Sequence, residues 1–153
     1  MMCEQQGRRS WEAAIILSER RDKRAIESMK RMLTSKHPVL GQIVAEALAA
    51  YGNDHFDALL EALPNSTDLT QITILSGLER IHDQRAVAPL IAFLQAGHNS
   101  ILTYTTIRTL GALGDQRAVD LIRTFVNHDD AHIAKHARMA LQQLEAASKN
   151  LEE

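Results

Sequence analysis

The sequence is poor in aromatic residues and in cysteine. Phe, Trp and Tyr make up only 4% of its 153 residues, and Cys3 is the one cysteine. A single cysteine cannot form an internal disulfide, so a reducing, cytoplasmic setting is the expected one. Scarce aromatics combined with plentiful Ala and Leu favour helices, because Ala and Leu have high helix propensities.

The sequence also lacks long apolar runs and familiar enzyme motifs. It contains no apolar stretch of about 18 residues, so we expect no membrane span. The apolar part of the N-terminal segment, AAIIL, is too short for a secretory signal. The phosphate-binding and dinucleotide-binding glycine motifs and the G-x-S-x-G elbow are absent. We therefore expect a protein that is not an enzyme and needs no cofactor.

The net charge of −2 conceals an uneven distribution of charges. Residues 1–36 hold nine Lys or Arg against five acids, a balance of +4, and the remainder holds eight against fourteen, a balance of −6. A basic end can attract nucleic acid or an acidic protein. Alternatively, these bases pair with nearby acids on solvated helix faces.

A repeat dominates the rest of the sequence. The string DQRAV begins at Asp83 and again at Asp115, and the related DKRAI begins at Asp22. One leucine in each unit recurs at spacings of 30, 32 and 31 residues, at Leu48, Leu78, Leu110 and Leu141. In DQRAV the Asp is typical of a helix N-cap and Ala-Val of first core contacts. The Gln-Arg pair either faces solvent or links to the next repeat.

Each repeat has room for two helices. Apolar residues of the third repeat share one helical face in its first helix, at Ala86, Val87, Leu90, Ile91 and Leu94. Helices are predicted over 10–20, 23–34, 38–51, 53–63, 68–81, 84–96, 100–113, 116–127 and 130–146. One such pair cannot bury its apolar face alone, whereas stacked pairs share a core. We predict an all-α, right-handed α-α solenoid of about nine helices.

The repeat spacing also fixes the expected domain organisation. A single repeat domain over 10–147 would contain a half repeat at 10–21 and repeats at 22–51, 52–82, 83–114 and 115–145. The tails 1–9 and 148–153 are expected to be disordered.

The strings DQRAVAPLIAFL and TLGALGDQRAV resemble HEAT-like repeats of the phycobilisome-lyase type. The resemblance covers 83–145 closely and 22–52 less closely, and it implies a HEAT-like superhelix. It also implies a function as a subunit or relative of a bilin lyase. The family usually places an Arg one residue after the first apolar anchor of each second helix. In this sequence those places hold Gly41, Gln71 or its neighbour, Thr103 and Ala134.

The segment NHDDAHIAKHARMA suggests a weak metal site. His132 and His136 are four residues apart on one helix face, and His128 or Asp129 could add a third ligand. HEAT-like proteins of the deoxyhypusine hydroxylase type bind two irons through His-Glu dipeptides, and this sequence contains no such dipeptide. We expect no activity of that type and favour a solvated helix start without metal.

The second helices of a solenoid offer the face on which partners usually bind. The residues expected there are Ile72, Thr73, Tyr104, Thr105, Arg108, Lys135 and His136. Tyr and Arg are enriched in binding hot spots. Alternatively, Tyr104 packs on a neighbouring helix and Arg108 pairs with Glu46 or Glu79.

The leading hypothesis is a non-enzymatic adaptor whose partner, another protein, binds this face. Two rivals remain open: the relative of a bilin lyase, and nucleic-acid binding by the basic N-terminal third, which low overall basicity and few aromatics disfavour. A homodimer is a further alternative, because the apolar first helix (Ala14, Ile15, Ile16 and Leu17) would end the solenoid uncapped.

Overall fold

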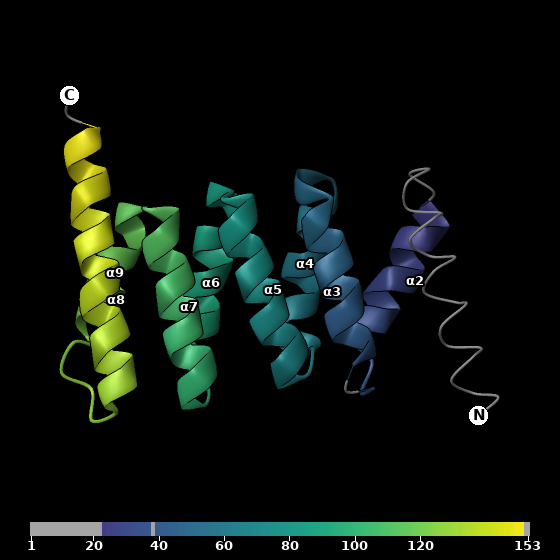
Figure 1. Ribbon diagram of the computed structural model, residues 1–153, viewed down its shortest axis with the longest axis horizontal. Coiled ribbons are helices and arrows are strands. Elements are labelled where there is room, and N and C mark those ends of the chain that lie inside the picture. Colours follow the sequence, from purple (N-terminus) through teal and green to yellow (C-terminus); the bar gives the residue numbers. More distant parts are fainter. Residues whose placement is uncertain (1–22, 38, 152–153) are drawn as a thin grey trace. The chain divides into compact units, whose positions relative to one another are not determined.

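The computed structural model describes residues 23–37 and 39–151 of the chain. These residues contain eight α-helices, four short 3₁₀-helices and no β-strand (Figure 1), which confirms the all-α prediction for the described part. The predicted helix over 10–20, the half repeat and the tail 1–9 lie outside the described residues. None of the described helices has the length and apolar character needed to cross a membrane.

The helices follow the predicted order closely. The α-helices are α2 (Lys23–Leu33), α3 (Leu40–Ala50), α4 (Phe56–Ala62), α5 (Asp68–Ile81), α6 (Val87–Gln95), α7 (Ser100–Leu113), α8 (Val119–Arg123) and α9 (Ala131–Asn150). The 3₁₀-helices are η1 (Gly52–His55), η2 (Leu63–Asn65), η3 (Gln84–Ala86) and η4 (Gln116–Ala118). Both α5 and α7 begin and end where the sequence predicted.

The chain divides into two compact units, Met1–Ile74 and Leu75–Glu153. In the first unit, α2, α3 and α4 pack on one another. Its core includes Met29, Leu33, Leu48, Phe56 and Leu59. In the second unit, α6 packs on α7, and both α7 and α8 pack on α9. Its core includes Leu90, Ile107, Leu110, Ile122 and Leu144.

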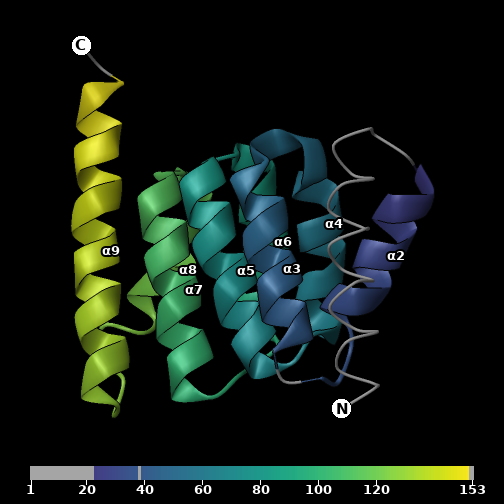
Figure 2. The same ribbon diagram turned by 45° about the vertical axis from the view of Figure 1, so that its right-hand side comes forward.

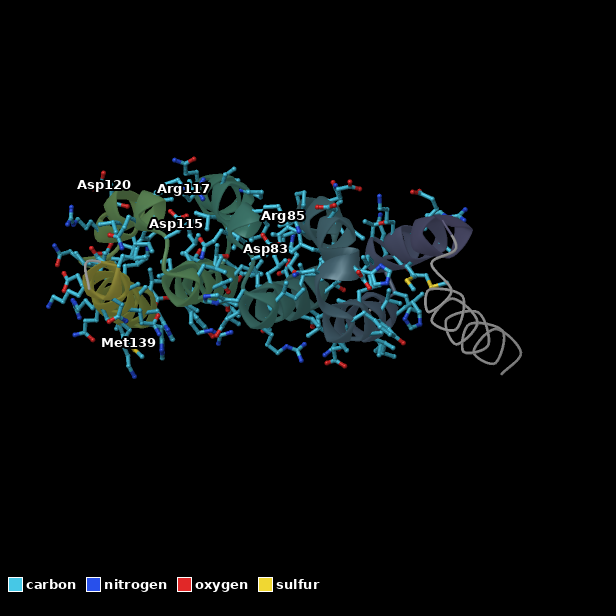
Figure 3. All side chains as sticks on the ribbon, turned by 90° about the horizontal axis from the view of Figure 1, so that it is seen from above. Asp83, Arg85, Asp115, Arg117, Asp120 and Met139 are labelled. Atoms are coloured by element: carbon cyan, nitrogen blue, oxygen red, sulfur yellow. The ribbon has the colours of Figure 1, made fainter. Side chains whose placement is uncertain are left out.

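The second unit has two layers of helices. Figure 2 shows α7 and α9 side by side, and these two helices make the most extensive packing in the unit. Figure 3 shows Asp120 of α8 and Met139 of α9 at opposite sides of the unit. The first helices of the repeats therefore form one layer and the second helices the other, as expected for an α-α solenoid.

The repeated Asp caps the helix start, as predicted. Asp83 Oδ1 accepts the backbone N–H of Arg85 at 2.8 Å, and Asp115 Oδ1 accepts that of Arg117 at 2.9 Å. Each repeat then begins with a 3₁₀ turn, in which Ala86 N donates to Asp83 O at 3.0 Å. The structure thus places one tight turn before α6 and α8 where the sequence predicted continuous helix.

The Gln and Arg of DQRAV have separate tasks. Arg85 and Arg117 fold back on the carboxylates of Asp83 and Asp115, each with a closest contact of 2.7 Å (Figure 3). Gln84 Nε2 donates to Leu113 O at 2.6 Å, and Gln116 Nε2 donates to Leu144 O at 2.8 Å. Each Gln therefore joins the start of its repeat to the end of the same repeat, and not to the next repeat.

The last repeat differs most from the prediction. Helix α8 ends at Arg123 instead of residue 127, because the following N–H groups bond three residues back, as Phe125 N does to Ile122 O at 3.0 Å. Val126 is consequently half-exposed instead of buried. Helix α9 continues to Asn150, so residues 148–150 of the expected tail are helical.

Candidate functional site

The structure divides the predicted partner-binding residues between the two units. Ile72 and Thr73 belong to the first unit, where both are half-buried on α5 and the Thr73 hydroxyl donates to Leu69 O at 3.1 Å. The remaining five lie on α7 and α9 of the second unit. The site is therefore built within the second unit.

The placement of Thr105 on the exposed face is wrong. Its side chain is only 3% exposed, and its hydroxyl donates to Ile101 O one turn earlier at 2.6 Å. Thr106 and Thr109 behave in the same way, bonding to Leu102 O at 2.7 Å and to Thr105 O at 3.0 Å. These threonines satisfy their own hydroxyls inside α7, so they can be buried at little cost.

A glycine allows α7 and α9 to approach closely. A Cβ atom on Gly111 would lie 2.7 Å from Ala140 Cβ and from Gln143 Oε1. Because two small residues meet here, the faces of the two helices come together. Side chains of α7 can then contact side chains of α9 near the surface.

Tyr104 and His136 make that contact. Their rings stack with centroids 4.9 Å apart and planes 13° from parallel, and His132 lies farther from Tyr104, at 6.4 Å. Both stacked residues remain half-exposed. Tyr104 therefore packs on a neighbouring helix, as the alternative predicted. The stacked pair is still partly exposed to solvent.

Arg108 forms the ion pair that the same alternative predicted. Its Nε donates to Glu79 Oε2 at 3.1 Å, and the side chains are 42% and 31% exposed. An ion pair this exposed contributes about 1 kcal/mol at most, so Arg108 could exchange this partner for another carboxylate.

Two exposed apolar side chains lie on the same helices as the stacked rings, Ile101 three residues before Tyr104 and Met139 three residues after His136. Ile101 is 50% exposed and Met139 is 47% exposed. Ile101 was missed by sequence reasoning, although its position three residues before Tyr104 was the available signal. We define the α7–α9 face as Ile101, Tyr104, Arg108, Lys135, His136 and Met139.

The environment of His136 favours its neutral form. Burial lowers the pKa of its imidazole, and the positive charges of Arg108 and Lys135 lower that pKa further. The α7–α9 face therefore presents a neutral ring pair beside the permanent charges of Arg108 and Lys135.

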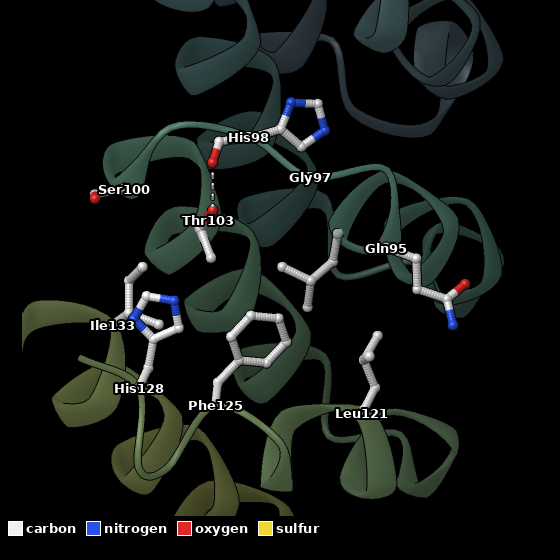
Figure 4. Close-up of a pocket in the computed structure, with 10 residues that line it drawn as sticks. Gln95, Gly97, His98, Ser100, Thr103, Leu121, Phe125, His128 and Ile133 are labelled. Atoms are coloured by element: carbon white, nitrogen blue, oxygen red, sulfur yellow. Dashed lines mark hydrogen bonds between the residues drawn. The ribbon is translucent and has the colours of Figure 1, made fainter. Parts of the chain in front are cut away.

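A second feature of this unit is a hollow of about 470 Å³ at the turns that precede α7 and α9 (Figure 4). Its apolar wall includes Leu121, Phe125 and Ile133. Its polar groups are already used: Thr103 Oγ1 donates to His98 O at 3.2 Å, and His128 Nδ1 accepts the N–H of Asp130 at 3.0 Å. Its titratable lining, within the described residues, consists of His98 and His128.

The weak metal site at His132 and His136 gains no third ligand. No group of three or more His, Cys, Asp or Glu within the described residues is placed to hold a metal ion. His128 Nδ1 is engaged by a backbone N–H, and the Asp130 carboxylate caps α9 by accepting His132 N–H at 2.8 Å. His128 and Asp130 therefore hold the first turn of α9.

The basic N-terminal third lies mostly outside the described residues. Within its described part, Lys30 Nζ pairs with Glu61 at 2.7 Å and with Glu27 at 3.7 Å. Lys30 is therefore paired with acids, as expected if the basic residues pair with nearby acids on helix faces.

Comparison with known proteins gives the family. The model of HEAT repeats matches residues 56–142, and the chain therefore belongs to the HEAT-repeat family. This match identifies HEAT repeats in general and does not distinguish the phycobilisome-lyase type among them. No curated protein matches the chain.

A solved structure supports the fold. The structure of human deoxyhypusine hydroxylase in complex with glycerol is similar to this chain, with a TM-score of 0.71 and 18% sequence identity. The similarity covers 83% of this chain and 46% of that one, so this chain spans about half of its length. The predicted α-α solenoid of HEAT-like repeats is thereby confirmed.

The same similarity overturns the expectation of a protein that is not an enzyme. That expectation rested on the absence of short motifs. The similar structure is an enzyme, and its sequence is only 18% identical to this chain. In a repeat protein, catalytic residues can be spread over several repeats. A search for compact motifs does not test for an activity of that kind.

Proposed function

We propose that the α7–α9 face binds another protein. The observation that supports this is the exposure of Ile101 and Met139 on the two helices that carry the stacked rings of Tyr104 and His136. Protein interfaces combine apolar and aromatic centres with a polar rim, and Tyr and Arg dominate their energetics. Arg108 stands at the edge of this arrangement in an ion pair that is easily exchanged.

Capture from the native host, followed by mass spectrometry, tests the proposal. The sharpest variant is Ile101→Gln combined with Met139→Gln, because it removes exposed apolar surface without touching the Tyr104–His136 stack. We expect this double variant to lose the captured partner while its helicity is unchanged. Tyr104→Ala should have the same effect on capture.

Leu151 provides a matched control. It is 82% exposed at the end of α9, outside the α7–α9 face, so Leu151→Gln should leave capture intact. If the double variant captures the same proteins as the native chain, the face is not the binding site. A second copy of the chain as the occupant would appear as a change in sedimentation on the same substitutions.

A second candidate function follows from the two DQRAV strings, which resemble repeats of the phycobilisome-lyase type. It predicts that the protein binds a bilin. Mixing the protein with a bilin should then change the visible absorption, and an unchanged spectrum would dismiss this candidate. Both functions fit a reducing, cytoplasmic setting, which remains an expectation from the single cysteine.

A further inference from the structure

The charged side chains that α7 and the first part of α9 contribute are all basic, and Glu79 of α5 brings a carboxylate to the α7–α9 face by pairing with Arg108. Neither α7 nor the part of α9 from Ala131 to Leu144 contains an Asp or Glu, whereas these stretches hold Arg108, Lys135 and Arg138. The whole chain, by contrast, has more acids than bases. The second helices of the last two repeats are thus locally basic on a slightly acidic protein.

Two of these cations lack a carboxylate partner. Within the described residues, neither Lys135 nor Arg138 forms an ion pair, and the guanidinium of Arg138 instead donates to Val126 O at 2.9 Å. Arg85 and Arg117, on the opposite layer, are each held by an adjacent Asp. Lys135 and Arg138 are three residues apart and therefore neighbours on the surface of α9, with the guanidinium of Arg138 turned toward Val126 O.

The same cations act on the ring of His136. After burial, the charges of Arg108 and Lys135 contribute to its lowered pKa. Exposed apolar side chains belong to the same helices, Ile101 to α7 and Met139 to α9. A segment that fits this surface carries carboxylates around an apolar side chain.

We propose that the partner segment bound by the α7–α9 face is an acidic stretch of protein with an apolar anchor. Its anchor would lie against Ile101 and Met139, and its carboxylates would pair with Lys135 and Arg138. This inference rests on the proposed function and adds the chemistry of the partner. Few cations and an exposed apolar centre favour a protein over nucleic acid, whose binding needs many phosphate contacts.

A fluorescent peptide in which Glu alternates with Leu and Phe is a direct probe, used with the full chain. We expect it to bind, and a peptide with Gln in place of Glu to bind more weakly. Binding of the Glu peptide should weaken between about 0.1 M and about 1 M salt, as the Debye length falls from about 10 Å to about 3 Å.

Charge variants test whether Lys135 and Arg138 bind the carboxylates of the peptide. Lys135→Gln combined with Arg138→Gln should raise the Kd for the Glu peptide by about three- to tenfold, the range expected for two exposed ion pairs. Lys149→Gln is the matched control, because this lysine is exposed on the last turn of the same helix and should not change the Kd. Circular dichroism shows whether each variant keeps its helices.

Four results would overturn the inference: no binding of the Glu peptide, equal binding of the Gln peptide, an unchanged Kd in the double charge variant, or tighter binding of a short oligothymidylate through the same residues. None of these affects the proposed function if Ile101→Gln with Met139→Gln still abolishes capture of the native partner. Conversely, unchanged capture by that apolar variant refutes the proposed function whatever the peptide does.

Discussion

At the scale of single residues, the repeated string is explained by its backbone bonds. Asp83 and Asp115 cap the helix start, and the Gln that follows each reaches a carbonyl at the end of the same repeat. A neutral hydrogen bond of this kind contributes about 1 kcal/mol to stability. The string therefore recurs because each of its side chains fits one fixed local geometry.

Gln116→Ala should lower the free energy of unfolding by about 1 kcal/mol, because the Leu144 carbonyl loses its side-chain donor. Urea denaturation measures the change. Gln142→Ala, on the exposed side of α9, serves as the control and should change stability by less than half as much. Equal effects at the two sites would show that the bond contributes nothing.

His82 has a positive φ of 58°, and Gly114 at the matching place of the next repeat has a φ of 73°. A side chain in this left-handed region costs about 1–2 kcal/mol, and glycine avoids that cost. We expect His82→Gly to raise the free energy of unfolding by about 1 kcal/mol in urea. The reverse change, Gly114→Ala, should destabilise the protein, since its Cβ would also lie 3.2 Å from Ala147 Cβ.

His55 predicts a loss of stability in acid. Its ring is buried, Nδ1 has no hydrogen-bond partner, and burial lowers the pKa below the usual 6.5 despite the opposing charge of Asp54. The unfolded chain therefore binds the proton more readily than the folded one. Stability is complete above about pH 6.5 and falls as the pH drops below that value.

Urea denaturation at about pH 7.5 and about pH 5.5 measures this change, because imidazoles titrate between the two. His136, whose pKa is lowered too, contributes in the same direction. Comparison with His55→Leu isolates the part due to His55, and the variant should lose less stability in acid. An identical decrease in the variant would assign the whole effect to other groups.

At the scale of helices, the contact between α7 and α9 depends on the small residues at its centre. Gly111→Ala would place a methyl group 2.7 Å from Ala140 Cβ, so the helices must separate. We expect a loss of about 1–3 kcal/mol, typical of overpacking, measured by thermal unfolding. Ala112→Ser, one residue along and half-exposed, should change stability little. An unchanged melting temperature for Gly111→Ala would mean that the contact is loose.

Helix limits were predictable where caps and periodicity agree. Asp68 and Ser100 are the first residues of α5 and α7, Asn99 caps α7 by accepting the N–H of Leu102 at 3.0 Å, and the apolar spacing carries both helices to their ends. The end of α8 was not predictable, because the apolar spacing continues through Val126 while the backbone has already turned at Thr124. The 3₁₀ turns after Asp83 and Asp115 also left no mark on the apolar pattern.

Part of the candidate site was equally predictable. The positions of Tyr104 and Arg108 on one side of α7 followed from helical spacing, and Glu79 was one of two partners foreseen for Arg108. Thr105 was misplaced and Ile101 overlooked because exposure depends on how closely α9 approaches α7. That approach is set by the contact of Gly111 with Ala140, residues distant in sequence from the surface they shape.

At the scale of the whole molecule, the chain is a HEAT-repeat protein that corresponds to about half of one similar solved structure. That structure is an enzyme, and its sequence is 18% identical to this chain. What this chain shares with that structure is the architecture on which a face can be varied without loss of the core.

The two Gln bonds have a mechanical consequence. Residues 84 and 113 are bonded to each other, as are residues 116 and 144, so the chain enters and leaves each repeat at neighbouring points. A force applied along the chain would act on these two hydrogen bonds before it acted on the helices between them. Once one of these hydrogen bonds broke, the helices of that repeat could be pulled apart, and the chain would extend in steps of one repeat.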